Sequence, residues 1–176
     1  TGTVEVLREF CAAADIAIEV VPPVEFQDDI VSSSRVRRLL ADGDVDVVQG
    51  LLTQPYRLRG MVTHGAGRGA SIGFPTANLE AIDTILPGQG VYAGLGSDGQ
   101  QTWPAAINIG PNPTFGEVEN KVEVHLIGCN ESLYARALEV DFLSRLRDIR
   151  PFANADELKV QLADDVQAAL LLAAVH

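Results

Sequence analysis

A glycine-rich segment in the middle of the chain gathers the residues best suited to bind a ligand. It occupies residues 64–78, reads HGAGRGASIGFPTAN, and holds four glycines, one arginine and several small polar side chains. Glycine lets the main chain come close to a ligand and present N–H groups to an anion. The segment therefore predicts a loop that covers phosphate groups. A plain hairpin loop is the alternative, because short glycine motifs also occur by chance.

The overall charge limits what such a loop could bind. The chain has 24 Asp and Glu against 13 Lys and Arg, and its net charge of −11 repels nucleic acids and anionic membrane surfaces. Backbone N–H groups and a divalent cation act at short range and can still hold phosphate on an acidic protein. A phosphate site here should depend on glycine and a metal ion, and we expect neither nucleic acid nor membrane as a partner.

The composition is that of an ordinary globular protein. Hydrophobic residues make up 47% of the chain and charged ones 21%. No apolar run approaches the roughly 20 residues that span a bilayer, and the first residues lack a secretory pattern. The two cysteines, Cys11 and Cys129, have no CxxC spacing, which argues against a disulfide framework or zinc site. We expect a cytoplasmic location.

The first 54 residues have a mixed helix and strand pattern. Residues 4–11 are weakly helical, and the β-branched run at residues 16–21 predicts a strand that ends at two prolines. Three serines at residues 32–34 provide hydroxyls to cap a short helix that Gly43 ends, and residues 45–52 predict a second helix. The turn at Gln54 and Pro55 is the expected boundary between two domains, residues 1–54 and 55–176.

From residue 56 the pattern changes to short strands separated by Gly, Pro and Asn, typical of an antiparallel barrel or sandwich. At residues 121–127 Val122 and Val124 alternate with Glu123 and His125, so the two ionisable side chains share one face. The last element should be an amphipathic helix, which begins after the capping pair Asn154 and Glu157 and packs on the β domain.

Several short strings resemble the riboflavin kinase family. The end of the glycine-rich segment, residues 73–78, is similar to the family's PTAN motif. The similarity continues in family order through GVYA at 90–93, NIG at 108–110, PTF at 113–115, VEVH at 122–125, LY at 133–134 and LRD at 146–148. Residues 30–37, IVSSSRVR, look like the ISSTRIR motif near the end of the FMN adenylyltransferase module of bifunctional bacterial FAD synthetases.

The resemblance implies a six-stranded Greek-key β-barrel with a C-terminal helix, preceded by the tail of an α/β nucleotidyltransferase module. It assigns Thr76 and Asn78 to Mg²⁺ and the ATP phosphates, and Glu123 to the general base. Hydroxyl and amide oxygens are hard donors that suit Mg²⁺ without adding negative charge beside a triphosphate. The loop residues expected to bind the nucleotide are Gly65, Gly67, Arg68, Gly69, Ser71 and Gly73, and the candidates on the flavin side are Arg147 and Asp148.

Each assignment has a structural alternative. Thr76 and Asn78 could serve only the turn after Pro75, and Glu123 could lie on a solvated face. Arg68 could be a solvated loop residue, and Arg147 with Asp148 a surface ion pair.

His125 could support Glu123 or be a histidine whose hydrogen bonds are satisfied elsewhere. Two positions depart from the family pattern. Ala70 stands where many relatives have a second basic residue, and residues 127–129, Ile-Gly-Cys, replace a Leu-Asp-Phe-like stretch.

The resemblance implies that the chain transfers the γ-phosphate of MgATP to riboflavin and yields FMN and ADP. In-line phosphoryl transfer depends mainly on placement and electrostatic stabilisation. The early phosphate-binding string of the adenylyltransferase, of the type Gly-x-Phe-Asp-Gly-x-His-x-Gly-His, is absent from these 176 residues, so we do not expect FAD formation. The rival is a flavin- or nucleotide-binding barrel without turnover. The sequence leaves the oligomeric state open.

Overall fold

The computed structural model describes residues 2–65, 67–111 and 120–176, without the side chain of Arg68. The PTF string at residues 113–115 lies outside this description. The chain forms two compact units, Thr1–Val31 and Ser32–His176, and each is described by itself. The two cysteines, Cys11 and Cys129, are free. In the described part of the chain, no helix is both long and apolar enough to cross a membrane.

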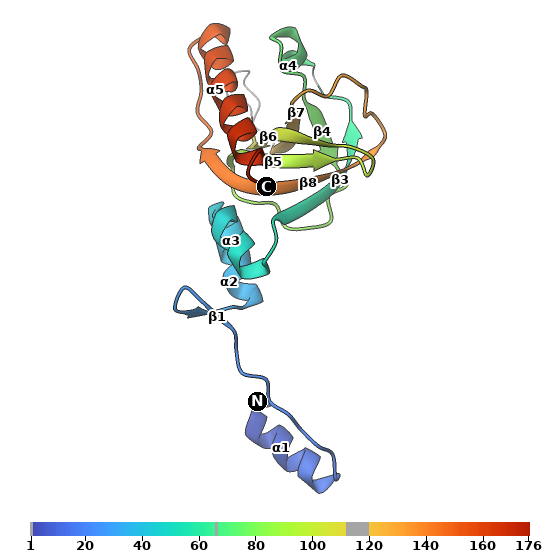
Figure 1. The fold of residues 1–176 in the computed structure, drawn as a ribbon, viewed down its shortest axis with the longest axis vertical. Coiled ribbons are helices and arrows are strands. Elements are labelled where there is room, and N and C mark those ends of the chain that lie inside the picture. Colours follow the sequence, from blue (N-terminus) through green and yellow to red (C-terminus); the bar gives the residue numbers. More distant parts are fainter. Residues whose placement is uncertain (1, 66, 112–119) are drawn as a thin grey trace. The chain divides into compact units, whose positions relative to one another are not determined.

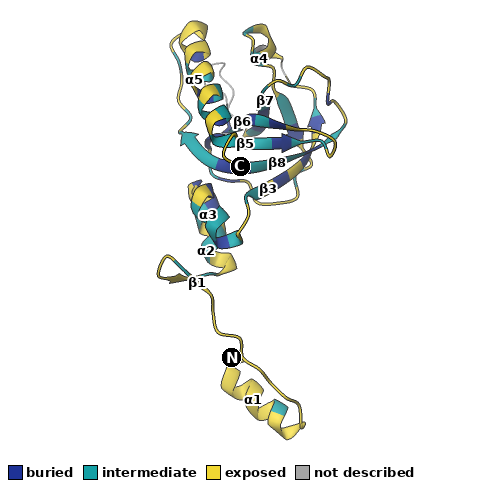
Figure 2. Ribbon diagram, viewed as in Figure 1, coloured by how far each residue is buried: buried dark blue, intermediate teal, exposed yellow. Residues whose placement is uncertain are grey.

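The first unit consists of one helix and a small hairpin. Helix α1, Val4–Ala13, begins at Thr3, whose side chain accepts a hydrogen bond from the Val6 N–H, and all its residues are at least partly exposed (Figure 2). Strands β1, Glu25–Phe26, and β2, Asp29–Ile30, pair antiparallel. The strand predicted at residues 16–21 is wrong, since these residues are irregular and exposed. β-branched residues form a strand only with a hydrogen-bonded neighbour, and no described strand pairs with this run.

The second unit is built on a closed six-stranded barrel (Figure 1). Its strands are β3, Tyr56–Thr63; β4, Ala77–Glu80; β5, Gly90–Ser97; β6, Thr102–Gly110; β7, Lys121–Leu126; and β8, Ala137–Arg147. They are ordered β3-β4-β7-β6-β5-β8, and β8 also pairs with β3 to close the barrel. The segment β8-β5-β6-β7 has the spatial order of a Greek key. The predicted six-stranded Greek-key barrel is therefore confirmed.

Alternation along the strands separates the barrel core from its outer surface. In β7 the three hydrophobic residues are buried and the intervening Lys121, Glu123 and His125 are partly exposed. The largest side chains that are fully buried include Tyr92, Phe142, Leu58, Ile107 and Leu138. They meet inside the barrel in one hydrophobic cluster. A polar residue on these strands thus faces outward, where a ligand can reach it.

Two short helices precede the barrel and pack on it. Helix α2, Ser33–Asp42, is capped by Ser32 and ends at Gly43, whose φ of 83° is left-handed. Helix α3, Val45–Leu52, buries Val45 and Val48 completely and contacts β3 and β8. Both helices match the prediction, and so do the caps predicted for α2 at Ser32 and Gly43. The predicted boundary at residue 54 separates two domains defined by sequence, and it stays a prediction. The compact unit of the structure begins earlier, at Ser32, because α3 packs against the barrel.

Two further helices flank the barrel strands. Helix α4, Arg68–Ser71, has only four residues, lies where β4 begins, and was not predicted, because a run of Gly and Ala has no hydrophobic period (Figure 1). Helix α5, Ala155–Ala173, begins at Asn154, whose side chain accepts a 2.9 Å hydrogen bond from the Glu157 N–H. It contacts β5, β6 and β8, as the predicted C-terminal helix should.

Candidate functional site

Strand register brings four polar residues into one row on the outside of the barrel. Thr63 of β3 lies opposite Asn78 of β4, Asn78 opposite Glu123 of β7, and Glu123 opposite Asn108 of β6. Residues directly opposite on paired strands point to the same face, with Cβ atoms about 5 Å apart. All four are partly exposed, and their sequence neighbours are mostly buried in the core. Asn78 and Glu123, which the sequence singled out separately, are therefore adjacent.

The glycine-rich loop lies against the two predicted metal ligands. A Cβ atom built on Gly65 would come within 2.0 Å of the Asn78 amide nitrogen, so any other residue at this position would force the Asn78 side chain to move. A Cβ on Gly69 would lie 2.2 Å from the Phe74 carbonyl oxygen and 3.6 Å from the Thr76 hydroxyl. The Phe74 N–H donates to the Gly69 carbonyl at 2.8 Å. Gly65 and residues 67–73 thus lie against the segment that carries Thr76 and Asn78.

The remaining loop residues shape the turn. Gly67 and Gly73 have φ angles of 68° and 94°, a left-handed conformation that other residues rarely adopt. Ser71 is exposed at the end of α4. The predicted phosphate contact of Arg68 involves a side chain that lies outside the described part of the structure.

A cavity of about 300 Å³ opens beside this loop. Thr76, Gly65, Gly67, Cys129 and Tyr134 are among its lining residues. At its wall the rings of His64 and Tyr134 stack, with centroids 3.7 Å apart and planes inclined by 20°. A cavity of this size, lined by apolar and aromatic groups with a few polar ones, is typical of small-molecule sites.

The oxygen donors of Thr76 and Asn78 fit a hard cation. In the described residues no group of three or more His, Cys, Asp and Glu is gathered as a metal site. Two uncharged donors alone hold Mg²⁺ weakly, and Mg²⁺ usually takes most of its ligands from phosphates and water. The residues therefore fit a metal ion that arrives with a phosphate ligand.

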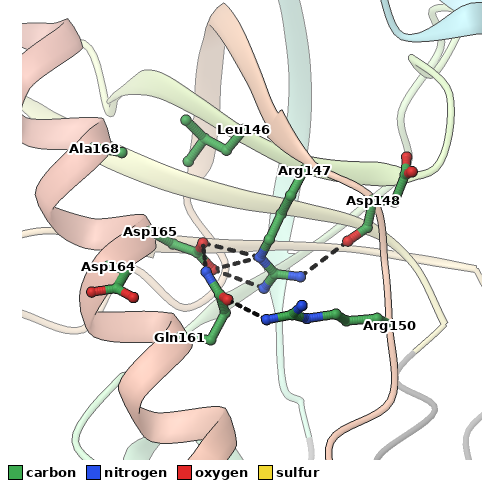
Figure 3. Close-up of a pocket in the computed structure, with 8 residues that line it drawn as sticks. All are labelled: Leu146, Arg147, Asp148, Arg150, Gln161, Asp164, Asp165 and Ala168. Carbon is green, nitrogen blue, oxygen red and sulfur yellow. Dashed lines mark hydrogen bonds and ion pairs between the residues drawn. The ribbon is translucent and has the colours of Figure 1, made fainter.

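A second cavity, of about 480 Å³, lies between the end of β8 and helix α5 (Figure 3). Its lining includes the two flavin-side candidates, Arg147 and Asp148, together with Arg150, Gln161 and Asp165. The two candidates do not form the surface ion pair considered as their alternative, because the Asp148 carboxylate pairs instead with Arg145 at 2.8 Å. The contact of Arg147 with Asp148 is to its backbone, since Nη1 donates to the Asp148 carbonyl oxygen at 3.1 Å.

The carboxylate that binds Arg147 comes from helix α5. The Nε and Nη2 groups of Arg147 donate to the two Asp165 oxygens at 3.0 and 2.8 Å, and only 3% of the Asp165 side chain is exposed. Gln161 donates to the same carboxylate at 3.0 Å. This forked pair fixes α5 against β8 and forms one wall of the cavity.

The row of polar residues leads towards this second cavity. Asn108 lies opposite Val91 of β5, and Val91 lies opposite Arg147 of β8. With strands about 4.8 Å apart, Glu123 and Arg147 are separated by three strand spacings, roughly 14 Å along the sheet. Glu123 thus stands between the glycine loop on one side and the α5 cavity on the other. Asn108, the connecting residue, was missed as a site residue although it begins the NIG string.

His125 lies next to the row and makes its hydrogen bond elsewhere. Its Nδ1 atom is 2.7 Å from the carbonyl oxygen of Pro75, and its ring makes a T-shaped contact with the ring of Phe74. The satisfied histidine, one of the two alternatives, is what the structure shows.

Comparison with known proteins agrees with the motifs. The family model described as riboflavin kinase matches residues 52–172. Proteins named bifunctional riboflavin kinase/FMN adenylyltransferase are 38% identical in Bacillus subtilis, over 82% of this chain and 47% of the relative, and 37% identical in Pseudomonas fluorescens, over 98% and 56%. The chain thus spans about half the length of these relatives.

A solved structure also matches. It is described as a macrolide-efflux protein from Streptococcus pneumoniae, and it superposes with a TM-score of 0.85 at 35% identity, over 96% of this chain and 55% of that one.

The pair between Arg147 and Asp165 gives a stability prediction. Asp165→Ala leaves a largely buried guanidinium without its carboxylate, and we expect the free energy of unfolding to fall by about 3 kcal/mol. Urea unfolding followed by circular dichroism measures the change. Asp164→Ala is the matched control, since this neighbour is exposed and should change stability by less than about 0.5 kcal/mol. Equal stability of the two variants would contradict a role for the pair in holding α5.

Proposed function

The chain belongs to the riboflavin kinase family, and from this premise we propose that its barrel transfers the γ-phosphate of MgATP to the 5′-hydroxyl of riboflavin, giving FMN and ADP. The observation that carries the proposal is the adjacency of Asn78 and Glu123, with the glycine-rich loop against Asn78. This adjacency supports the proposal, because the loop proposed to bind phosphate, the oxygen donors proposed for a cation and the carboxylate proposed as the base occupy neighbouring positions on one surface.

On the nucleotide side, ATP would occupy the cavity of about 300 Å³ beside the loop. The N–H groups of the loop would face the phosphates, and Gly65, Gly67, Gly69 and Gly73 let the backbone come close. Ser71, and Arg68 as the loop's one basic residue, are further candidates for phosphate contacts. Thr76 and Asn78 would hold Mg²⁺, which when bound offsets the negative charge of the phosphates.

Glu123 would act on the nucleophile. As the riboflavin 5′-oxygen bonds to the γ-phosphorus, the bond from that phosphorus to the bridging oxygen breaks and ADP leaves with the electron pair. The hydroxyl proton passes to the Glu123 carboxylate, as in general-base catalysis. Because little covalent chemistry falls to the protein in phosphoryl transfer, correct placement supplies most of the rate.

The flavin would bind on the side of the second cavity. Arg147 is engaged by Asp165, so it would shape the cavity wall, while Asp148 is exposed at the rim and remains a candidate for direct contact. As part of this proposal we keep a cytoplasmic location, because ATP as co-substrate and two free thiols fit a reducing compartment.

The rival, a flavin- or nucleotide-binding barrel without turnover, differs in one measurement. The purified chain is incubated with riboflavin and MgATP, and the flavins are separated chromatographically. We expect FMN to accumulate and, because the adenylyltransferase string is absent from these 176 residues, no FAD. Binding of both ligands without FMN would favour the rival, and FAD formation from FMN and ATP would overturn the expected lack of adenylyltransferase activity.

Replacing Thr76 tests the metal site. Thr76→Ala should raise the Mg²⁺ concentration needed for half-maximal rate by about tenfold or more, since a polar contact to a charged group contributes about 1.5–3 kcal/mol. Riboflavin affinity without nucleotide should stay the same. Thr102→Ala, at an exposed position where β6 begins, is the control. An unchanged Mg²⁺ profile in Thr76→Ala would remove this residue from the metal site.

Replacing Glu123 tests the base. Glu123→Gln keeps the shape but cannot accept the proton, and general-base loss typically lowers kcat by about 10²–10⁴-fold. Riboflavin affinity and melting temperature should remain close to those of the parent. Glu80→Gln, on an exposed strand position, should be silent. If kcat of Glu123→Gln falls only a few-fold, Glu123 is a solvated residue; if the melting temperature falls instead, its role is structural.

A further inference from the structure

We propose that His125 is a positioning residue, which holds Thr76 in place through the backbone of Pro75. The inference rests on the proposed function, because it gives Thr76 a part in binding the metal and nucleotide. It starts from a contact that the alternation pattern did not reveal, between the imidazole of His125 on β7 and the carbonyl oxygen of Pro75 at 2.7 Å.

The direction of this hydrogen bond follows from its partners. A carbonyl oxygen can only accept, so Nδ1 of His125 carries the proton and donates it. Both the Nδ1–H neutral ring and the doubly protonated ring can do so. The contact is therefore a fixed structural link between β7 and the residue before Thr76.

The link lies where backbone pairing stops. The ladder between β4 and β7 begins with Ala77 opposite Val124, and the same antiparallel register continued by one residue would set Thr76 opposite His125. Pro75 has no N–H to donate, so the ladder cannot extend through it. Beyond the last backbone pair, the imidazole N–H of His125 donates to the Pro75 carbonyl oxygen and supplies a side-chain link between the two strands. Thr76 directly precedes the four-residue strand β4 and lies outside its backbone ladder, so the link to Pro75 helps to hold it.

Three successive attachments then fix the segment around Thr76. The Phe74 N–H donates to the Gly69 carbonyl at 2.8 Å, Pro75 accepts from His125, and Ala77 pairs in the sheet. The rings of Phe74 and His125 also make a T-shaped contact, with centroids 5.6 Å apart and planes at 66°. Because His125 and Glu123 lie on the same strand, the link holds Thr76 at a constant offset from the proposed base.

The test separates the hydrogen bond from ring packing. His125→Phe keeps an aromatic ring against Phe74 but has no donor. His125→Asn places an amide N–H near the position of Nδ1, whereas His125→Gln places it near Nε2. Partners that orient a metal ligand typically contribute 10–100-fold to metal affinity. We expect His125→Phe to weaken Mn²⁺ binding in the presence of ADP by about that factor, measured by electron paramagnetic resonance, and His125→Asn to restore more of it than His125→Gln.

A second measurement needs no nucleotide. Hydrogen exchange of the peptide covering residues 74–78 should be faster in His125→Phe than in the parent, and slowed again in His125→Asn. The inference is overturned if His125→Phe and the parent bind Mn²⁺ with equal affinity and show equal hydrogen exchange. It is also overturned if His125→Phe melts at a lower temperature but binds Mn²⁺ with unchanged affinity. If His125→Phe does not fold, the order of His125→Asn and His125→Gln decides. If the parent chain forms no FMN but hydrogen exchange still differs between the parent and His125→Phe, the proposed function is disproved and the link between His125 and Pro75 stands.

Discussion

The antiparallel pairing of β4 with β7 is the constraint on which the rest of the site depends. Side chains alternate between the two faces of a strand, so a slip of one residue would turn Asn78 into the core and break its alignment with Glu123. Only three residue pairs define this register. It is secured by Leu79, Val122 and Val124, which are buried in the barrel cluster and could not be exposed without a large loss of hydrophobic burial. The core thus determines which polar residues meet outside.

The loop and the helix on either side of this pairing are held by different means. The glycine-rich loop comes close to residues 74–78 because its glycines have no side chains. A Cβ on Gly65 would collide with Asn78, and one on Gly69 would collide with the Phe74 backbone. Helix α5 is held by burial together with the forked pair of Asp165 and Arg147. The loop, which is kept in place by backbone contacts, can adjust to a ligand. Helix α5, which is fixed by a buried ion pair, gives the cavity between β8 and α5 a rigid wall.

Local features of the chain were predictable because their causes are local. Caps at Ser32 and Asn154 and the alternation in β7 arise from neighbouring residues. The run at residues 16–21 misled because strand formation requires a partner that sequence alone does not supply. The row from Asn78 through Glu123 to Asn108 was not predictable, since it depends on register between strands far apart in the chain. Asp165 could have been found, because it lies seven residues after buried Leu158 and four before buried Ala169, on the apolar stripe of α5.

The two departures from the family pattern, at Ala70 and at residues 127–129, have local structural explanations. These bear on the rival function, a flavin- or nucleotide-binding barrel without turnover. Gly128 follows β7 with a φ of 86°, a turn that a larger residue would strain, and the Cys129 N–H donates to the Leu126 carbonyl at 3.3 Å. The turn directs the chain so that Cys129 and Leu133 line the cavity beside Thr76. Ala70 is exposed on α4, whose backbone still closes on Phe74. Neither substitution disturbs the pairing of β4 with β7, and so the sequence can vary at these positions while Asn78 and Glu123 remain neighbours.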